Sequence, residues 1–143
     1  LVGSEMCIRD RLSEHLGKEM TPAVVRAFAE AFIRSMPTGK QNTFANRTLP
    51  DAVYLTIRED QPVNLCGAFE RAVPASLEGY VEPSKRRLVE YAQQMYQTYA
   101  DAPSEALTIG AGLEQLAQSM PMKAALSALE DAVRQRLGGN GVA

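Results

Sequence analysis

The stretch TPAVVRAFAEAFIRSMPTGKQNTFANRTLPDAVYLTIRED, residues 21–60, joins a helical pattern to a strand pattern through a polar segment. In its first part, Val25, Phe28, Phe32 and Met36 recur at the spacing of one helix face, which predicts an amphipathic helix.

The sequence also predicts where this helix begins and ends. Thr21 is the predicted N-cap, with Pro22 in the first helical position, where a missing amide costs little. Pro37 and Gly39 are expected to end the helix.

Residues 51–60, DAVYLTIRED, show the alternation of a half-buried strand. Val53, Leu55 and Ile57 fall on one face, and the residues between them fall on the other. A helix and an alternating strand within a chain of 143 residues indicate one α+β domain.

The remaining patterns agree with that class. Residues 61–73, QPVNLCGAFERAV, predict a second strand with a bend at Gly67, and residues 105–110 predict a further short strand. Residues 83–102 and 122–139 predict helices; the second has its apolar residues in register at Met122, Leu126, Leu129, Val133 and Leu137. The expected fold is α+β, with three helices and two or three strands.

The composition excludes several classes of protein. A net charge of −2 and a pI near 5.5 argue against a basic surface over the whole domain. No apolar run approaches a membrane span and no secretion signal is recognisable, so we expect a cytoplasmic protein with no membrane partner. Cys7, Cys66 and His15 make neither a disulfide framework nor a zinc site, so no metal and no cofactor is expected. Cys66 is predicted to be buried and His15 exposed.

The first residues, LVGSEMCIRD, continue no pattern found in the rest of the chain. They match the translation of a sequencing adapter, which extends into Arg11. We therefore expect residues 1–11 to be a translated scar, and residues 12–143 to be the C-terminal portion of a single longer domain.

The polar segment resembles a phosphate-binding loop only superficially. That loop needs a glycine five residues before the Gly-Lys pair and a Ser or Thr directly after it. Arg34 and Gln41 occupy these two positions, so the sequence argues against nucleotide hydrolysis.

The twenty residues from Ala31 to Pro50 contain no Asp or Glu, although the chain has 17 acidic residues. Lysines and arginines neutralise phosphates, and amide side chains bond phosphate or ribose oxygens. The segment offers Arg34, Lys40, Gln41, Asn42, Asn46 and Arg47, with Phe44 as a residue for base stacking or for the core. Composition alone leaves two hypotheses open, which are a nucleic-acid contact and an ordinary polar loop.

No catalytic constellation emerges elsewhere. The pairs Glu59–Asp60 and Glu130–Asp131 have no partner base in view and are predicted to face solvent, as is the basic run at residues 84–87. We expect a protein that is not an enzyme and has no catalytic residues.

One family shares the central motifs. The elements are Gly39-Lys40-Gln41, Phe44-Ala45, Asp51 at the start of a strand, and Asn64 followed by Ala68-Phe69-Glu70. In order and spacing they resemble the backbone subunit of the type I-E CRISPR interference complex, Cascade, which is the CasC-type branch of CRISPR-associated protein family seven. The resemblance covers essentially all of residues 12–143 and about the last third of a family member.

The resemblance implies a modified RNA-recognition-motif-like (ferredoxin-like) palm without catalytic residues. It implies antiviral defence, with copies assembled head-to-tail along a CRISPR guide RNA, beside other Cascade subunits, and with target DNA read through the guide. It places Lys40, Gln41, Asn42 and Arg47 at or near the guide. Some members carry lysines after the Ala-Phe-Glu element; here only Arg71 remains, which puts a contact there in doubt.

Two alternatives are kept. The polar segment could make contacts between protein subunits and touch no RNA, which the acidic pI favours. The chain could also be a CRISPR-related endoribonuclease, but no carboxylate for that chemistry is identified, and Asp51 is better explained as a strand-entry residue. A metal-dependent cleavage assay separates this last hypothesis from the others.

Overall fold

The computed structural model describes residues 5–35, 49–77 and 79–139. In chain order the elements are helix α1 (Glu5–Arg34), strand β1 (Val53–Ile57), a short 3-10 helix η1 (Cys66–Phe69), helix α3 (Val81–Thr98), strand β2 (Glu105–Ile109) and helix α4 (Met122–Gly139). The predicted α+β class is confirmed.

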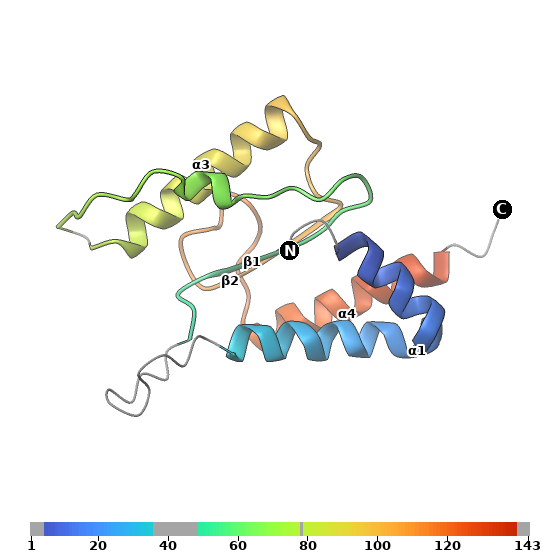
Figure 1. Cartoon of the computed structure of the whole chain (residues 1–143). Coiled ribbons are helices and arrows are strands. Elements are labelled where there is room, and N and C mark those ends of the chain that lie inside the picture. Colours follow the sequence, from blue (N-terminus) through green and yellow to red (C-terminus); the bar gives the residue numbers. More distant parts are fainter. Residues whose placement is uncertain (1–4, 36–48, 78, 140–143) are drawn as a thin grey trace.

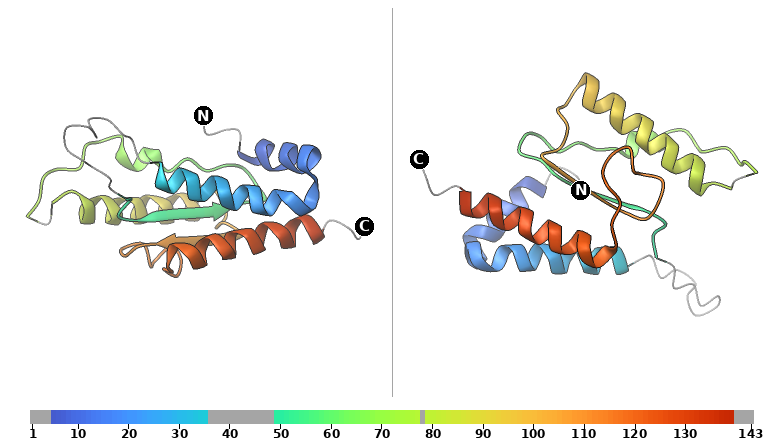
Figure 2. Two further views of the ribbon diagram at one scale, coloured as in Figure 1. Left: turned by 90° about the horizontal axis from the view of Figure 1, so that it is seen from below. Right: turned by 180° about the vertical axis from the view of Figure 1, so that it is seen from behind.

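Strands β1 and β2 form an antiparallel two-stranded sheet, in which Val53 lies opposite Ile109 and Ile57 opposite Glu105. Helices α1 and α4 cover one face of this sheet, and α3 lies on the other (Figures 1 and 2). The alternation predicted for residues 51–60 is therefore correct: Val53, Leu55 and Ile57 contribute to the core beneath α1 and α4.

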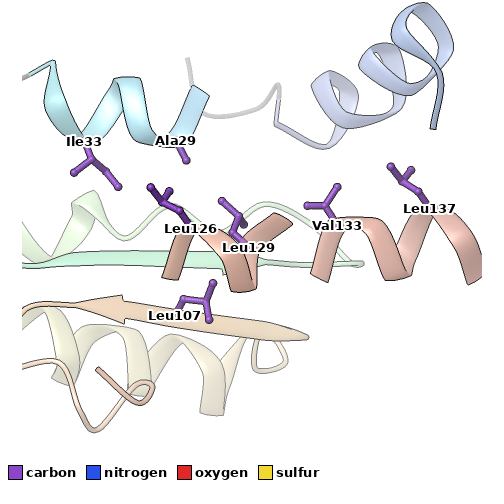
Figure 3. Close-up of a cluster of buried hydrophobic side chains, with 7 residues drawn as sticks. All are labelled: Ala29, Ile33, Leu107, Leu126, Leu129, Val133 and Leu137. Atoms are coloured by element: carbon purple, nitrogen blue, oxygen red, sulfur yellow. The ribbon is translucent and has the colours of Figure 1, made fainter. Parts of the chain in front are cut away.

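The hydrophobic core lies between α1, α4 and β2. Figure 3 shows its buried members, which are Ala29, Ile33, Leu107, Leu126, Leu129, Val133 and Leu137. The predicted register of α4 is confirmed, because four of its five in-register residues are buried and Met122 packs against the cluster.

Helix α1 differs from its prediction at its buried face. Phe28 and Phe32 are 70% and 74% exposed, while Ala29 and Ile33 face the core. Of the predicted face, Val25 does pack against the core, whereas Phe28 and Phe32 do not. Packing against α4 at close range selects the face that carries the small Ala29.

The start of this helix also differs from expectation. The helical backbone begins at Glu5, inside the expected scar, and is broken at Gly17, whose φ of 76° favours glycine. Thr21 is not an N-cap; its hydroxyl donates to the carbonyl oxygen of Gly17, 2.9 Å away, from within the next helical section. Pro22 follows the break closely, where few amides have helical partners.

The strand predicted for residues 61–73 is wrong. These residues form η1 and irregular backbone, and Cys66 is exposed where burial was expected. The Asn64 side-chain oxygen accepts the amide of Cys66 at 2.8 Å, and such an Asx turn favours a tight turn over an extended strand. His15 is exposed, as predicted.

Candidate nucleic-acid interface

The predicted guide-contacting residues Lys40, Gln41, Asn42 and Arg47 lie outside the described residues, as does Phe44. Their placement at a guide remains a prediction. The structure does describe what flanks the segment that carries them: α1 ends at Arg34, and residues 49–52 lead into β1.

A hollow of about 310 Å³ lies beside the start of β1. Its lining combines the entry to β1, the end of η1 and the first two turns of α3. The lining residues are Asp51, Ala52, Tyr54, Phe69, Tyr80, Val81, Ser84, Lys85, Leu88 and Leu113. The fold thus brings together Asp51 and Phe69, which belong to two of the motifs singled out in the sequence.

Small residues and a turn position Phe69. Ala68 is buried, and Gly67 lies so close to the Tyr91 hydroxyl that any larger side chain would collide with it. Helix η1 can therefore lie directly on α3, which leaves Phe69 at its end, 45% exposed, beside the hollow. The Ala-Phe-Glu element has a packing role here that requires no ligand.

The charges at this hollow are mixed. Lys85 pairs with Glu82 at 2.8 Å, and Asp51 also lines the hollow. Three aromatic side chains, Tyr54, Phe69 and Tyr80, dominate the wall, so apolar or aromatic groups fit this hollow better than free anions.

A second depression, of about 410 Å³, lies between the loop after η1 and α3, and three arginines line it. Arg71, Arg86 and Arg87 line it together with Glu90. Arg87 also donates to the carbonyl oxygen of Arg71 at 2.8 Å, which fixes the loop after η1 against α3. Guanidinium groups suit phosphate oxygens, and the Glu90 carboxylate reduces their net charge.

The sequence interpretation missed this arginine depression. The run at residues 84–87 was predicted to face solvent, and Arg71 was treated alone. No local signal reveals the grouping, because it depends on how the loop after η1 returns along α3. An irregular segment with no periodicity separates Arg71 from the basic run at residues 84–87.

A third cluster lies between β1 and the end of α3. The Arg58 side chain is only 7% exposed; it pairs with Asp60, donates to the Asp101 carbonyl oxygen at 2.7 Å and lies over the Tyr96 ring. The Tyr54 and Tyr96 hydroxyls are 3.3 Å apart. Burial, more than this bond, raises the pKa of Tyr54 well above its ordinary value, so its hydroxyl stays protonated and cannot serve as a base.

Two acidic pairs are better partnered than the sequence suggested. The hydrogen bond from Arg58 lowers the pKa of Asp60. Glu130 accepts from Arg26 at 3.0 Å and from Arg134 at 2.7 Å, and the Arg26 bond is the main cause of its lowered pKa. Glu59, Asp60 and Asp131 are exposed, as predicted. Glu130 differs from the prediction, because it is half-buried and its bond to Arg26 connects α4 to α1.

Within the described ranges, no group of three or more His, Cys, Asp and Glu residues is arranged to hold a metal ion. In the same part of the chain, none of the helices has the length and apolar content needed to cross a membrane.

Comparison with known proteins gives one family. The model of a family described as CT1975-like protein matches residues 8–135. Among curated proteins, none matches this chain.

Two solved structures resemble the chain at 30% sequence identity over 87% of its length. One is described as "CRISPR RNA-guided surveillance complex", with a TM-score of 0.77, and the other as "CRISPR RNA-guided surveillance complex, pre-nicking", with a TM-score of 0.74. The match covers 49% and 38% of those chains, so this chain spans half of their length or less.

Proposed function

The chain belongs to the CT1975-like protein family, and from this premise we propose that it is a guide-RNA-binding backbone subunit of a type I-E CRISPR surveillance complex. The observation that carries the proposal is its likeness, at 30% identity and a TM-score of 0.77, to a chain of a CRISPR RNA-guided surveillance complex. The role is one of binding and assembly, with no catalytic residue assigned.

The acid-free span from Ala31 to Pro50 is the proposed contact surface. Lys40 and Arg47 neutralise guide phosphates, while Gln41 and Asn42 bond phosphate oxygens or ribose hydroxyls. None of these groups reads a base, which suits a protein that must accept any guide. Base pairing between guide and target DNA then supplies the sequence specificity.

Copies of the subunit assemble head-to-tail along one guide in this proposal. A contact that does not close into a ring continues as a filament, and the guide fixes its length. Each copy needs only a few weak phosphate contacts, because binding along one RNA raises the effective concentration of the next copy.

The test is a charge reversal in the proposed contact surface. Lys40→Glu is compared with Lys123→Glu, an exposed lysine on α4 that undergoes the same change of charge. Binding is measured by fluorescence anisotropy on a single-stranded RNA that carries a CRISPR repeat, over a series of salt concentrations. Lys40→Glu should weaken binding several-fold and reduce the salt slope by about one, since one phosphate contact is lost.

Lys123→Glu should leave both quantities close to those of the unmodified chain. If Lys40→Glu also leaves them unchanged, the assignment of this surface to RNA fails. The acid-free span would then be assigned to contacts between protein subunits.

A further inference from the structure

Two members of the arginine depression, Arg71 and Arg87, bond no carboxylate among the described residues. Arg87 donates to the backbone carbonyl oxygens of Arg71 and Ala72, at 2.8 and 3.4 Å. Other arginines of the chain do bond a carboxylate; they are Arg26, Arg34, Arg58, Arg134 and Arg136. Arg71 and Arg87 therefore place two unpaired positive charges in one depression of a chain whose net charge is −2.

Carboxylates beside these arginines limit what can bind them. Glu90 lines the arginine depression, and Glu70 lines an adjoining depression of about 270 Å³ that Arg71 and Arg87 also line. A nucleic-acid backbone presents a continuous row of phosphates, which two fixed carboxylates would repel. A protein can instead present a single carboxylate in one place. The arginine depression therefore fits an acidic protein surface better than a nucleic acid.

The opposite end of α3 has the complementary character. A pocket of about 450 Å³, the Asp101 pocket, lies at its last turn, with Asp60, Tyr96, Tyr99 and Asp101 in the lining. Asp60 bonds the buried Arg58, whereas the Asp101 carboxylate bonds no cation in the described part of the chain. The last turn of α3 carries no basic residue.

Three features make the Asp101 pocket suitable for a guanidinium group. The carbonyl groups at the C-terminal end of a helix carry partial negative charge, which favours a cation. The exposed Asp101 carboxylate adds a full negative charge. Tyr99 is 74% exposed and offers a ring face on which a guanidinium can lie. Because Asp101 and Tyr99 are already exposed, binding requires no rearrangement of the fold.

The arginine depression and the Asp101 pocket lie near opposite ends of α3, so they cannot meet within one copy. Helix α3 has 18 residues and is therefore about 27 Å long. Helices α1 and α4 lie on the other face of the sheet (Figures 1 and 2). Two copies can bring the two sites together. Because the sites differ, a third copy can repeat the same contact, and the assembly stays open.

We propose that the arginine depression of one copy binds the Asp101 pocket of the next copy. The Arg71 guanidinium bonds the Asp101 carboxylate and lies on the Tyr99 ring, while Arg87 holds the loop after η1 in place. This inference rests on the proposed head-to-tail assembly and names the surfaces that form its contact. The contact needs no guide RNA, so a chain that fails to bind RNA still forms it, and the two proposals fail separately.

The experiment measures self-association of the 143-residue chain by sedimentation velocity at low salt, without RNA. All chains carry Phe28→Ser and Phe32→Ser, which removes the exposed phenylalanines of α1 as an alternative contact. The chain with intact charges should form oligomers that grow with concentration and dissociate at high salt. Arg71→Glu alone and Asp101→Arg alone should each lower the association constant at least tenfold, because like charges then face each other. Lys123→Glu on α4 is the control and should leave the constant unchanged.

A mixture of the two variants separates the proposed contact from damage to the fold. The Arg71→Glu chain keeps its Asp101 pocket, and the Asp101→Arg chain keeps its arginine depression. Alternating copies therefore have opposite charges at every contact, so an equal mixture should recover most of the association that each variant lacks alone.

Three results would overturn the proposal: no association of the chain with intact charges, association that neither variant alters, or a mixture that associates no better than its components. RNA binding of Arg71→Glu is measured on the same repeat-containing RNA as that of Lys40→Glu. Weaker RNA binding with unchanged self-association would assign the arginine depression to nucleic acid and would also overturn the proposal.

Discussion

Helices α1 and α4 lie against each other, yet they differ in how many neighbours their apolar residues have. In α4 the large apolar side chains form one stripe, and that stripe is in the core. In α1 the apolar residues cover two stripes, of which the one with Ala29 and Ile33 is buried and the one with Phe28 and Phe32 is exposed. This helix pair therefore has a buried interface between α1 and α4, and α1 has in addition an exposed apolar surface at Phe28 and Phe32.

The largest expected effect lies in the buried interface between α1 and α4. Leu126→Ala removes a side chain that is 2% exposed between α4 and α1, so it should lower the free energy of unfolding by about 2–5 kcal/mol. Urea denaturation measures this, with Leu77→Ala as the exposed control. A loss below about 1 kcal/mol would mean that the core of α4 can collapse around the gap, and the contrast between the helices would weaken.

A smaller effect is expected where Arg26 of α1 bonds Glu130 of α4. Because the folded-state pKa of Glu130 is lowered, its contribution is present above its unfolded pKa of about 4.3 and is lost as the pH falls through the folded value. Glu130→Gln should therefore melt at a lower temperature than the unmodified chain near pH 7. The difference should shrink in melts below about pH 4. A difference independent of pH would assign the effect to packing of the side chain.

The smallest effect is expected at the exposed apolar surface of α1. Phe32→Ser alters a side chain that is 74% exposed, so the free energy of unfolding of this chain should change by no more than about 0.5 kcal/mol. The same urea experiment measures it. A loss comparable to that of Leu126→Ala would show that Phe32 is covered in solution, for example by a second copy, and would remove the contrast between α1 and α4.

The same contrast explains what the sequence could predict. In α4 only one set of large apolar residues has helical spacing, so its buried face follows from periodicity. In α1 two sets qualify, and the spacing cannot show which of them meets α4. The prediction grouped Phe28 and Phe32 with Val25 by their spacing, whereas the fold buries Ala29, whose small side chain permits close approach.

The strand prediction for residues 61–73 failed for a different reason. A short apolar run fits a strand or a tight turn equally well, and the run alone does not distinguish them. Asn64 and Gly67 were the available signals: one closes an Asx turn, and the other permits contact with Tyr91. The arginine depression depends on a return of the chain along α3, so no local pattern predicts it. Lys40, Gln41, Asn42 and Arg47 remain predictions from sequence and resemblance.

The contacts between α3 and the sheet also determine which end of this helix should unfold locally first. At its C-terminal end, Arg58 holds the Asp101 carbonyl and lies over Tyr96, whose hydroxyl meets that of Tyr54 on β1. At its N-terminal end, Tyr80 and Val81 are exposed. Local unfolding follows the weaker ties first, so α3 should fray from Tyr80 while its other end exchanges its amides only together with β1. The hollow lies at the fraying end and can therefore widen without loss of the sheet.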